Sequence, residues 1–436
     1  MPPDARSWLD SLRSYTRPKL LVILFLGFSS GLPILLVNST LSAWLGEVGV
    51  DKATIGLFAA VGTAYSFNFL WAPLVDHVRL PLLGALGRRR SWMLLAQLVL
   101  FLAIAAMGLT DPAASPGLTA LAAAFVAFAS ATQDIVVDAY RTDILDEEEL
   151  GEGAAVGVFG YRMGMLVAGA GALYLAEFFG WQAAYAGMAG CVLVGMVTVL
   201  LAREPVPPVD EAPVEDDGLA ALLVERVQRA VVEPFADFMT KRGWWLLLFL
   251  VLFSKMADAF AVIMINPFLL ETGFTKVQIA EISKVFGFLA TTAGTVLGAA
   301  LIRRFGIVRS LWICIPIQML TNLVYIAQDR VGPEEWMLVL SISADNIAGG
   351  MAISAVIALM MQLCNARFTA TQYALLASLA SLGRTALSTG SGVVAEQGWA
   401  TFFTVSALLG VPALVALALL PRFVDLEELE HRETQA

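Results

Sequence analysis

The chain has 436 residues, of which 58% are hydrophobic and only 15% are charged, with a mean hydropathy of +0.76. Soluble proteins carry about 25% charged residues, and an apolar excess of this size cannot be buried in one globular core. The composition therefore excludes a soluble protein and indicates a polytopic membrane protein. The net charge of −10 gives no reason to expect a nucleic-acid partner, and the three cysteines show neither disulfide nor metal-ligand spacing.

Hydrophobic windows of about 20 residues, the length that crosses a bilayer, recur along the whole chain. They predict an all-α membrane protein with twelve transmembrane helices, at residues 19–45, 53–75, 91–109, 118–143, 153–178, 182–201, 244–270, 277–302, 308–327, 334–362, 370–394 and 400–420. Several windows exceed 20 residues, which implies that those helices are tilted or extend into the interface.

The distribution of Lys and Arg predicts the orientation of these spans, because cytoplasmic loops carry an excess of both. With the N-terminus inside, the outer loops receive only Lys52, Lys276 and Arg330, and the other basic residues outside the spans fall on the inner side. We therefore expect both termini in the cytoplasm and the first span as the targeting element.

One long connection, residues 203–243, separates two groups of six spans. It begins REPVPPVDEAPVEDD, which is rich in proline and acid and should be extended. Its second part, 219–241, has the spacing of an amphipathic helix, and two interpretations stay open: a helix on the inner membrane face or an ordinary linker helix. The predicted organisation is a first half at 1–202, this linker, a second half at 244–421 and a cytoplasmic tail at 422–436.

The two halves resemble each other in sequence. AEFFGWQAAY at 176–185 precedes the sixth span, and AEQGWATFF at 395–403 precedes the twelfth. Asp134 in the fourth span corresponds to Asp345 in the tenth. Two six-span halves with a central loop are typical of the major facilitator architecture, whose binding site lies near the membrane midplane between the halves.

Ionisable side chains inside the spans are the main functional candidates, since each carboxylate at the membrane centre costs about 2.5–3.5 kcal/mol on insertion scales. Four acids and four bases are placed this way: Asp134, Asp138, Asp258, Asp345, Arg162, Lys255, Lys284 and Arg384. Their balance suggests pairing in a water-filled cavity rather than exposure to lipid. Lys255 and Asp258 are three residues apart on one helix, so we expect an ion pair between them.

These residues suggest two roles. Bases and amides can hold an anionic or hydroxyl-rich ligand, and the substrate-binding candidates are Gln133, Arg162, Lys255, Lys284, Asn346 and Arg384. An acid can carry a coupled proton, and the candidates are Asp134, Asp138, Asp258 and Asp345. Asp134 and Asp138 are preferred, because they share a helix face without a base one turn away in the membrane core, Arg141 being nearer the interface. The alternative, ion pairs that only fix helix register, stays open.

The turn after the second span reads PLVDHVRLPLLGALGRRRSW. It resembles the facilitator signature between spans two and three, in which an acid and arginines form a latch, although an insertion makes the loop longer. We therefore predict a gating role for Asp76, Arg88, Arg89 and Arg90. The alternative is a set of positive-inside arginines without a latch.

Two features of the predicted helices concern how closely helices pack and where a helix breaks. The predicted fifth span contains Gly153, Gly157, Gly160, Gly164, Gly169 and Gly171. Small residues four apart permit close helix contact, either for sliding or for tight packing alone. Pro33 in the first span can break the helix and free carbonyl groups.

Motifs along nearly the whole chain carry a family resemblance. They are LGFSSGLP (26–33), FLWAPLVD (69–76), GRRRSW (87–92), SATQDIVVDAYRTDIL (130–145), GYRMGMLVAGA (160–170), VVEPFADF (231–238), KMADAFA (255–261), GGMAISA (349–355) and TQYALLASLASLGR (371–384). In this order they resemble the AmpG family of bacterial muropeptide permeases, of the major facilitator superfamily.

The resemblance implies import of N-acetylglucosaminyl-anhydro-N-acetylmuramic acid, with or without its peptide, across the bacterial inner membrane into the cytoplasm for cell-wall recycling. It implies a proton gradient as the driving force and no cofactor, with the small amino-sugar or peptide substrate and the lipid bilayer as partners of a monomer. It also implies that Arg162, Lys255, Lys284 and Arg384 face the substrate carboxylates.

Other functions remain as alternatives. Relatives with the same general pattern import siderophores or move acetyl-CoA. A membrane enzyme is disfavoured, because the sequence contains no G-x-x-x-x-G-K, H-E-x-x-H or G-x-S-x-G motif. His77 and His431 lie outside the predicted spans, which disfavours histidine base catalysis within the bilayer.

Overall fold

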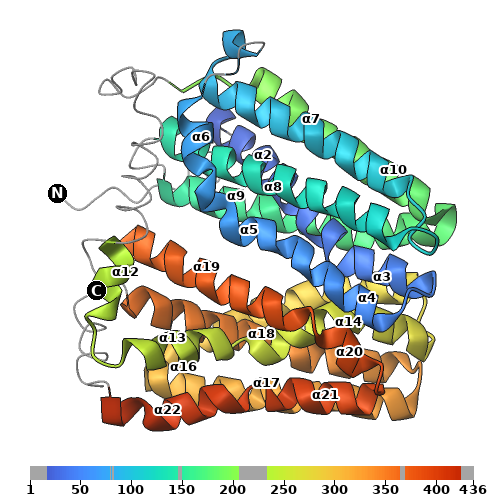
Figure 1. The fold of residues 1–436 in the computed structure, drawn as a ribbon, viewed down its shortest axis with the longest axis vertical. Coiled ribbons are helices and arrows are strands. Elements are labelled where there is room, and N and C mark those ends of the chain that lie inside the picture. Colours follow the sequence, from blue (N-terminus) through green and yellow to red (C-terminus); the bar gives the residue numbers. More distant parts are fainter. Residues whose placement is uncertain are drawn as a thin grey trace, which may run out of the picture. The chain divides into compact units, whose positions relative to one another are not determined.

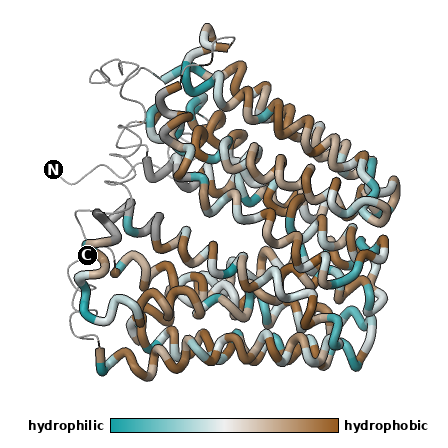
Figure 2. The backbone as a smooth tube through the Cα atoms, in the orientation of Figure 1, coloured by the Kyte–Doolittle hydropathy of each residue, from teal (hydrophilic) through white to brown (hydrophobic). Residues whose placement is uncertain are grey.

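The structure is a computed structural model that describes residues 17–78, 80, 83–145, 150–205, 233–363 and 369–423. Within these ranges every regular element is helical, which confirms the predicted all-α class. Figure 2 shows hydrophobic residues along most of the length of the long helices, such as α7 (Arg88–Gly108) and α10 (Ala172–Leu201). The predicted amphipathic helix at 219–241 lies mostly outside the described residues, which begin again at α12 (Glu233–Met239).

Nine helical runs among the described residues are long and apolar enough to cross a membrane. They are Pro18–Glu47, Arg88–Gly108, Pro116–Ile144, Val156–Leu201, Trp244–Thr272, Lys276–Phe305, Ile307–Val331, Glu335–Leu363 and Trp399–Phe423. Ten of the twelve predicted spans overlap these runs, the fifth and sixth sharing a single run, and the second and eleventh do not.

The predicted second span is divided into short elements: α4 (Lys52–Leu57), η1 (Phe58–Gly62), α5 (Thr63–Phe67), η2 (Asn68–Leu70) and α6 (Ala72–His77). Its 3₁₀ turns interrupt the α-helix, so no uninterrupted apolar helix of 18 residues forms. The predicted eleventh span is likewise divided, into α19 (Thr369–Ser388) and α20 (Ser391–Ala395).

The predicted fifth and sixth spans form one helical run. It consists of α9 (Leu150–Leu166), the π-helical segment η5 (Val167–Gly171) and α10. Gly180 has φ 81°, so α10 kinks there: its first arm is the end of the predicted fifth span and its second arm is the predicted sixth span. A residue with a Cβ is strained at such a positive φ, and a glycine is therefore required at the kink.

The residues fall into two compact units, of which the first comprises 1–41 and 68–214. Its long helices are α2 (Pro18–Val37), α7, α8 (Pro116–Ile144), α9 and α10, and Figure 1 shows α7 and α10 side by side. Helices α2 and α9 pack backbone to backbone, because a Cβ on Gly160 or Gly164 would overlap the carbonyl oxygens of Leu24 and Phe28. This confirms the close contact predicted from the glycines of span five; sliding stays a prediction.

The second unit comprises residues 42–67 and 215–436. Its longer elements are α13 (Trp244–Phe253), α14 (Met256–Thr272), η8 (Ile279–Phe286), α16 (Gly287–Phe305), α17 (Ile307–Val331), α18 (Glu335–Leu363), α19, α21 (Trp399–Leu408) and α22 (Val411–Phe423). Leu250, Leu311, Leu359 and Leu417 belong to an apolar core shared by α13, α17, α18 and α22. The polar side chains of these helices lie on other faces, away from this apolar core.

The first span bends after Pro33 rather than at it. Helix α2 continues through Pro33 to Val37, and Asn38 leaves the helical region (φ −114°, ψ −100°) before α3 (Ser39–Glu47) begins. Residues 42–67, which follow this bend, pack in the second unit. The division into halves at 1–202 and 244–421 stays a prediction from the sequence.

Candidate functional site

A group of charged side chains in the second unit is organised around Lys255. This residue precedes the first turn of α14, and its Nζ lies 2.7 Å from Oδ2 of Asp258, which confirms the predicted ion pair. The same Nζ donates a 3.5 Å hydrogen bond to the carbonyl of Gly349 on α18. Lys255 is only 7% exposed, so its charge is compensated inside the protein rather than by bulk solvent.

Asp345 on α18 belongs to the same group. The hydroxyl of Tyr325 on α17 donates a 3.2 Å hydrogen bond to its Oδ2, and Lys255 and Asp258 both act on it electrostatically. Tyr325 is fully buried and stacks on Phe403, with ring centroids 4.9 Å apart. The rigid aromatic packing therefore fixes the hydroxyl against the carboxyl group.

Arg384 on α19 is half-buried and interacts electrostatically with Asp258. The structure thus brings together four residues singled out in the sequence, which are Lys255, Asp258, Asp345 and Arg384. We call them, with Tyr325, the Lys255 cluster. Two cations beside two carboxylates can exchange partners when an anionic ligand or a proton binds.

Lys284 is arranged differently. It lies on the π-helical segment η8, and its Nζ donates a 3.2 Å hydrogen bond to Oδ1 of Asn266, a neutral amide. A π-helical segment is rare and frequently marks a functional position. Asn346, a further binding candidate, accepts a 2.7 Å hydrogen bond from Thr291 and donates to the carbonyl of Ile342. The positive charge of Lys284 is therefore solvated by an amide, which leaves it suited to an anion.

In the first unit, Gln133 and Asp134 are successive residues of α8. Gln133 is fully buried and accepts a 3.2 Å hydrogen bond from Ser29 on α2. Oδ1 of Asp134 is buried and has no hydrogen-bond partner among the described residues. Tyr161 on α9 lies within electrostatic range of both Asp134 and Asp138.

Asp138 has a basic partner, contrary to the expectation from the sequence. Its Oδ1 lies 3.0 Å from Nη2 of Arg141, and its side chain is 68% exposed. The i,i+3 spacing on one helix places the two groups together, although Arg141 lies nearer the predicted interface. Arg162, also predicted to bind substrate, lies half-buried on α9. Asp134 and Asp138 are therefore not equivalent acids.

The three predicted gating arginines begin α7. Nε of Arg89 lies 2.9 Å from Oδ2 of Asp143, at the end of α8. The backbone N–H groups of Arg89 and Arg90 donate hydrogen bonds of 2.8 and 3.0 Å to the carboxylate of Glu204. A carboxylate at a helix N-terminus accepts hydrogen bonds from the free N–H groups there and interacts favourably with the positive end of the helix dipole.

The same corner holds the end of α10. The side chain of Arg90 donates to the carbonyls of Val199 and Leu200, at 2.9 and 2.8 Å. Arg88 is the first residue of α7 and half-buried. The side chain of Asp76, the predicted acidic partner, lies outside the described residues, so its part in a latch stays a prediction.

Polar contacts also occur at the predicted outer ends of helices in the second unit. Nζ of Lys276 lies 2.7 Å from Oε1 of Glu47, and Nζ of Lys52 lies 2.9 Å from Oε2 of Glu271. Lys52 also lies 4.1 Å from the ring centroid of Trp399. Two of the three basic residues assigned to the outer side are thus held by carboxylates.

Comparison with known proteins identifies the family. The family model described as Major Facilitator Superfamily matches residues 23–388. The Escherichia coli protein named Anhydromuropeptide permease is 40% identical over 409 residues, which cover 93% of this chain and 80% of that protein. A Rickettsia conorii protein named Putative transporter AmpG 4 is 35% identical, over 92% of this chain and 95% of its own. The chain belongs to the AmpG family of the major facilitator superfamily.

Solved structures agree on the fold. The crystal structure of peptide transporter POT in complex with sulfate matches with a TM-score of 0.68 at 14% identity, over 93% of this chain and 94% of that one. The AmpG-family chain is therefore a multi-pass membrane transporter with the major facilitator fold. Its relatives are named as permeases and transporters, which confirms that it is not an enzyme.

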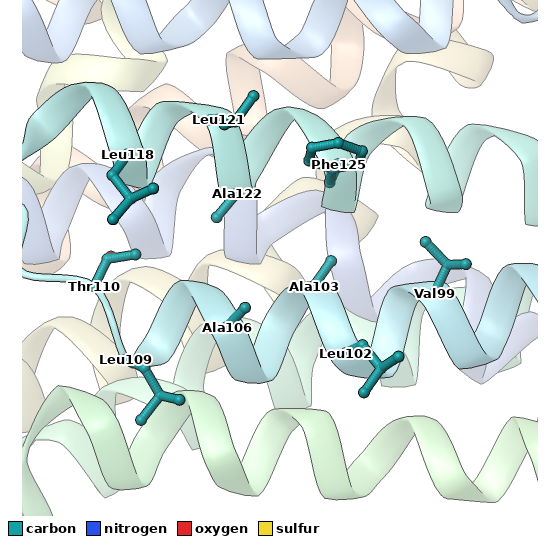
Figure 3. A pocket seen from close by; sticks show the side chains of 10 residues that line it. All are labelled: Val99, Leu102, Ala103, Ala106, Leu109, Thr110, Leu118, Leu121, Ala122 and Phe125. Atoms are coloured by element: carbon teal, nitrogen blue, oxygen red, sulfur yellow. The ribbon is translucent and has the colours of Figure 1, made fainter.

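A groove on the first unit lies apart from the charged residues of this AmpG-family transporter. It has a volume of about 580 Å³, and Figure 3 shows its side chains on α7 and α8, including Leu102, Ala106, Leu121 and Phe125. None of its lining residues is charged, and Leu102, Leu121 and Phe125 are more than half exposed. The groove is suited to apolar chains and not to an anionic solute.

Several polar partners were not predicted from the sequence. They are Tyr325, Asn266, Ser29, Asp143 and Glu204, each of which contacts a residue that was predicted. Asp143 and Glu204 could have been proposed from the sequence as partners of the arginines, since both are acids on the predicted inner side. Nothing in the sequence singled out Tyr325, Asn266 or Ser29, except that each is a polar residue in an apolar segment.

Proposed function

We propose that this AmpG-family chain imports anhydromuropeptides, N-acetylglucosaminyl-anhydro-N-acetylmuramic acid with or without its peptide, from the periplasm to the cytoplasm. Proton entry drives the import, no cofactor takes part, and the monomer works in the bacterial inner membrane. The observation that carries the substrate assignment is 40% identity with a protein named Anhydromuropeptide permease over 93% of this chain.

The chemistry of the binding candidates supports this substrate class. The ligand has a lactyl or peptide carboxylate and many hydroxyl and amide groups. Lys284 offers a positive charge that is hydrogen-bonded to the neutral amide of Asn266, and a carboxylate is its natural counter-ion. Arg384 and Lys255 offer two further cations, which the ligand would share with Asp258.

The surroundings of the acids support a proton as the coupled ion. Oδ1 of Asp134 is buried without a hydrogen-bond partner among the described residues, which leaves that oxygen open to a proton, while the hydroxyl of Ser30 acts on the same carboxyl group. Asp345, Asp258 and Lys255 form a group in which protonation of one acid changes the pairing of the others. The substrate carboxylate thereby competes with these acids for the cations, and an acid that loses its cation is free to take up the proton.

Uptake into membrane vesicles tests the proposal. Right-side-out vesicles that contain the protein should accumulate labelled anhydro-disaccharide when the outside is acidified, and a protonophore should abolish the accumulation. Vesicles without the protein are the control. A failure to take up the disaccharide under either condition, together with accumulation of a ferric siderophore or of acetyl-CoA, would refute the substrate assignment. Uptake that ignores the protonophore would refute proton coupling alone.

The Lys284→Met variant tests the anion site within the same assay. We expect a rise in the half-saturating disaccharide concentration of about tenfold, the loss of about 1.4 kcal/mol from one charge-assisted contact. Lys52→Met is a matched control, because Lys52 is paired with Glu271 and is not a binding candidate. An equal effect of both variants would show that Lys284 has no specific role in binding.

A further inference from the structure

Buried polar side chains gather inside the first unit, next to Asp134. They are Ser29 and Ser30 on α2, Gln97 on α7, and Ser130 and Gln133 on α8. All five are buried, and Gln97, Ser130 and Gln133 are inaccessible to solvent. We call this set the Gln97 cluster. Gln97, Ser29 and Ser130 have no part in the function proposed above.

A glycine makes room for this cluster. A Cβ on Gly195 of α10 would lie 2.7 Å from Nε2 of Gln97 and would overlap the hydroxyl of Ser29. Gln97 and Ser29 therefore approach the same point of α10, and a side chain there would force at least one of them to move. Ser29 continues the contact by donating its hydrogen bond to Gln133. Four helices thus enclose the polar groups.

Most polar atoms of the cluster have no protein partner. Among the described residues, this holds for Nε2 and Oε1 of Gln97, Nε2 of Gln133 and the hydroxyl of Ser130, besides Oδ1 of Asp134, whereas the hydroxyl of Ser30 acts on the carboxyl group of Asp134. Pro33 adds a further acceptor, because it has no N–H to donate to the carbonyl of Ser29 one turn earlier. Buried polar groups in native proteins are nearly always bonded to protein or to ordered water.

The set contains both hydrogen-bond donors and acceptors, and this indicates what kind of molecule would satisfy them. Two amide nitrogens can only donate, while Oε1 of Gln97 and Oδ1 of Asp134 accept. A metal cation would satisfy the oxygens alone and leave both nitrogens unmatched. Water donates and accepts, and an internal water typically makes about three hydrogen bonds to such groups.

We propose that the Gln97 cluster binds internal water molecules that hydrate Asp134, and that Gln97 is a positioning residue for proton uptake by that acid. The Ser29–Gln133 hydrogen bond anchors α8 at the residue beside Asp134, and Gly195 keeps the space open. The water molecules connect Gln97 on α7 with Asp134 on α8. The second part of this proposal rests on the proton coupling proposed above.

Hydration is tested without any transport assay. Gln97→Leu replaces the amide by an apolar group of similar size. If water binds there, the variant loses those hydrogen bonds and its apparent melting temperature in detergent falls by a few degrees, whereas Gln97→Asn recovers part of the loss. If the cluster is dry, the variant removes two unpaired groups and melts at the same or a higher temperature. That second result would overturn the proposal.

A structure that resolves ordered solvent supplies the direct check. Density for water within hydrogen-bond distance of Oε1 of Gln97 and Nε2 of Gln133 is expected. A direct hydrogen bond between the two amides, or a sodium ion coordinated by Asp134, would overturn the assignment of water.

The positioning role is tested by the pH profile of uptake. Gln97→Leu should move the pH of half-maximal gradient-driven uptake by about one unit and leave substrate exchange at equal pH on both sides within about twofold. Gln318→Leu is the control: Gln318 is a buried amide of α17 in the second unit, and its pH profile should match the wild type. An unchanged profile in Gln97→Leu would overturn the positioning role. A wild type without gradient-driven uptake refutes the proposed coupling instead, and the melting temperatures still decide hydration.

Discussion

The two units surround their corresponding acids differently. Asp345 of the second unit accepts a hydrogen bond from Tyr325 and lies within range of Lys255, whereas Oδ1 of Asp134 in the first unit has no partner among the described residues. The sequence repeat relates these two acids, yet only one of them is placed among cations. The comparison teaches that one repeat position can hold a paired acid in one unit and, in the other, an acid with an oxygen that no described residue bonds.

The largest effect on uptake is expected from breaking the ion pair between Lys255 and Asp258 in the second unit. Lys255→Met leaves Asp258 and Asp345 near each other without their closest cation. Removing one partner of a fully buried pair costs about 3–5 kcal/mol, and less here because Asp258 is 34% exposed. We expect a fall of more than about tenfold in uptake and a lower yield of folded protein by size-exclusion chromatography. A second variant, Lys255→Met with Asp258→Asn, should recover folding; if it does not, the pair is not what stabilises this region.

The next effect concerns the acid of the first unit. Asp134→Asn should keep the protein inserted, retain substrate exchange and reduce accumulation against a gradient by at least about tenfold, because a permanently neutral amide cannot carry the proton. Asp138→Asn should have a smaller effect, since Asp138 is exposed and paired with Arg141. Both variants are compared in the vesicle assay with and without protonophore. The reverse order of effects would assign proton coupling to Asp138.

Tyr325→Phe tests how far the hydrogen bond matters within the Lys255 cluster. The ring contacts with Phe403 and Phe268 remain, and only the bond to Asp345 is lost. A hydrogen bond to a charged group contributes about 1.5–3 kcal/mol, so we expect a decrease of about tenfold in the uptake rate. The loss of the same bond should also lower the melting temperature by a few degrees, so the amount of folded protein is measured alongside uptake by size-exclusion chromatography. An unaltered uptake rate would place Asp345 outside the transport cycle.

The smallest effect is expected at an acid outside the spans. Asp51 caps α4 by accepting a 2.7 Å hydrogen bond from the backbone N–H of Thr54, which lowers the pKa of its carboxyl group below 3.8. Asp51→Ala should reduce stability by about 1 kcal/mol, measured by thermal melting.

The sign of this shift sets the pH range in which the cap contributes. A lowered pKa means that the stabilisation is present above the ordinary value of 3.8 and is lost as the pH falls through the lower, folded value. Wild type and Asp51→Ala should therefore show the same pH profile of uptake between about pH 5.5 and about pH 8. A different profile would mean that Asp51 does more than cap a helix.

Features that depend on neighbouring residues were predictable. Hydropathy windows indicated helices, and nine described runs of suitable length confirm the class. The spacing of Lys255 and Asp258 predicted an ion pair, because residues three apart share a helix face. The same rule applies to Asp138 and Arg141, which also lie three residues apart and form a pair although Arg141 lies nearer the predicted interface.

Helix interruptions were harder to predict. The division of the predicted second span into short α and 3₁₀ elements, and the position of the first bend at Asn38 rather than Pro33, depend on packing as well as composition. An apolar run of 20 residues has the same hydropathy whether it is continuous or kinked. A window average therefore cannot distinguish the two.

The sequence by itself determined the membrane class, the helical spans, the eight charges inside them and the membership of the AmpG family. Only the tertiary structure decided which side chains of different helices meet: Tyr325 with Asp345, Lys284 with Asn266 and Arg89 with Asp143. It also placed Gln97 against Ser29 beside Gly195. The physical reason is that contacts within a helix follow from residue spacing, whereas contacts between helices depend on how each helix is rotated and where its small residues allow a close approach.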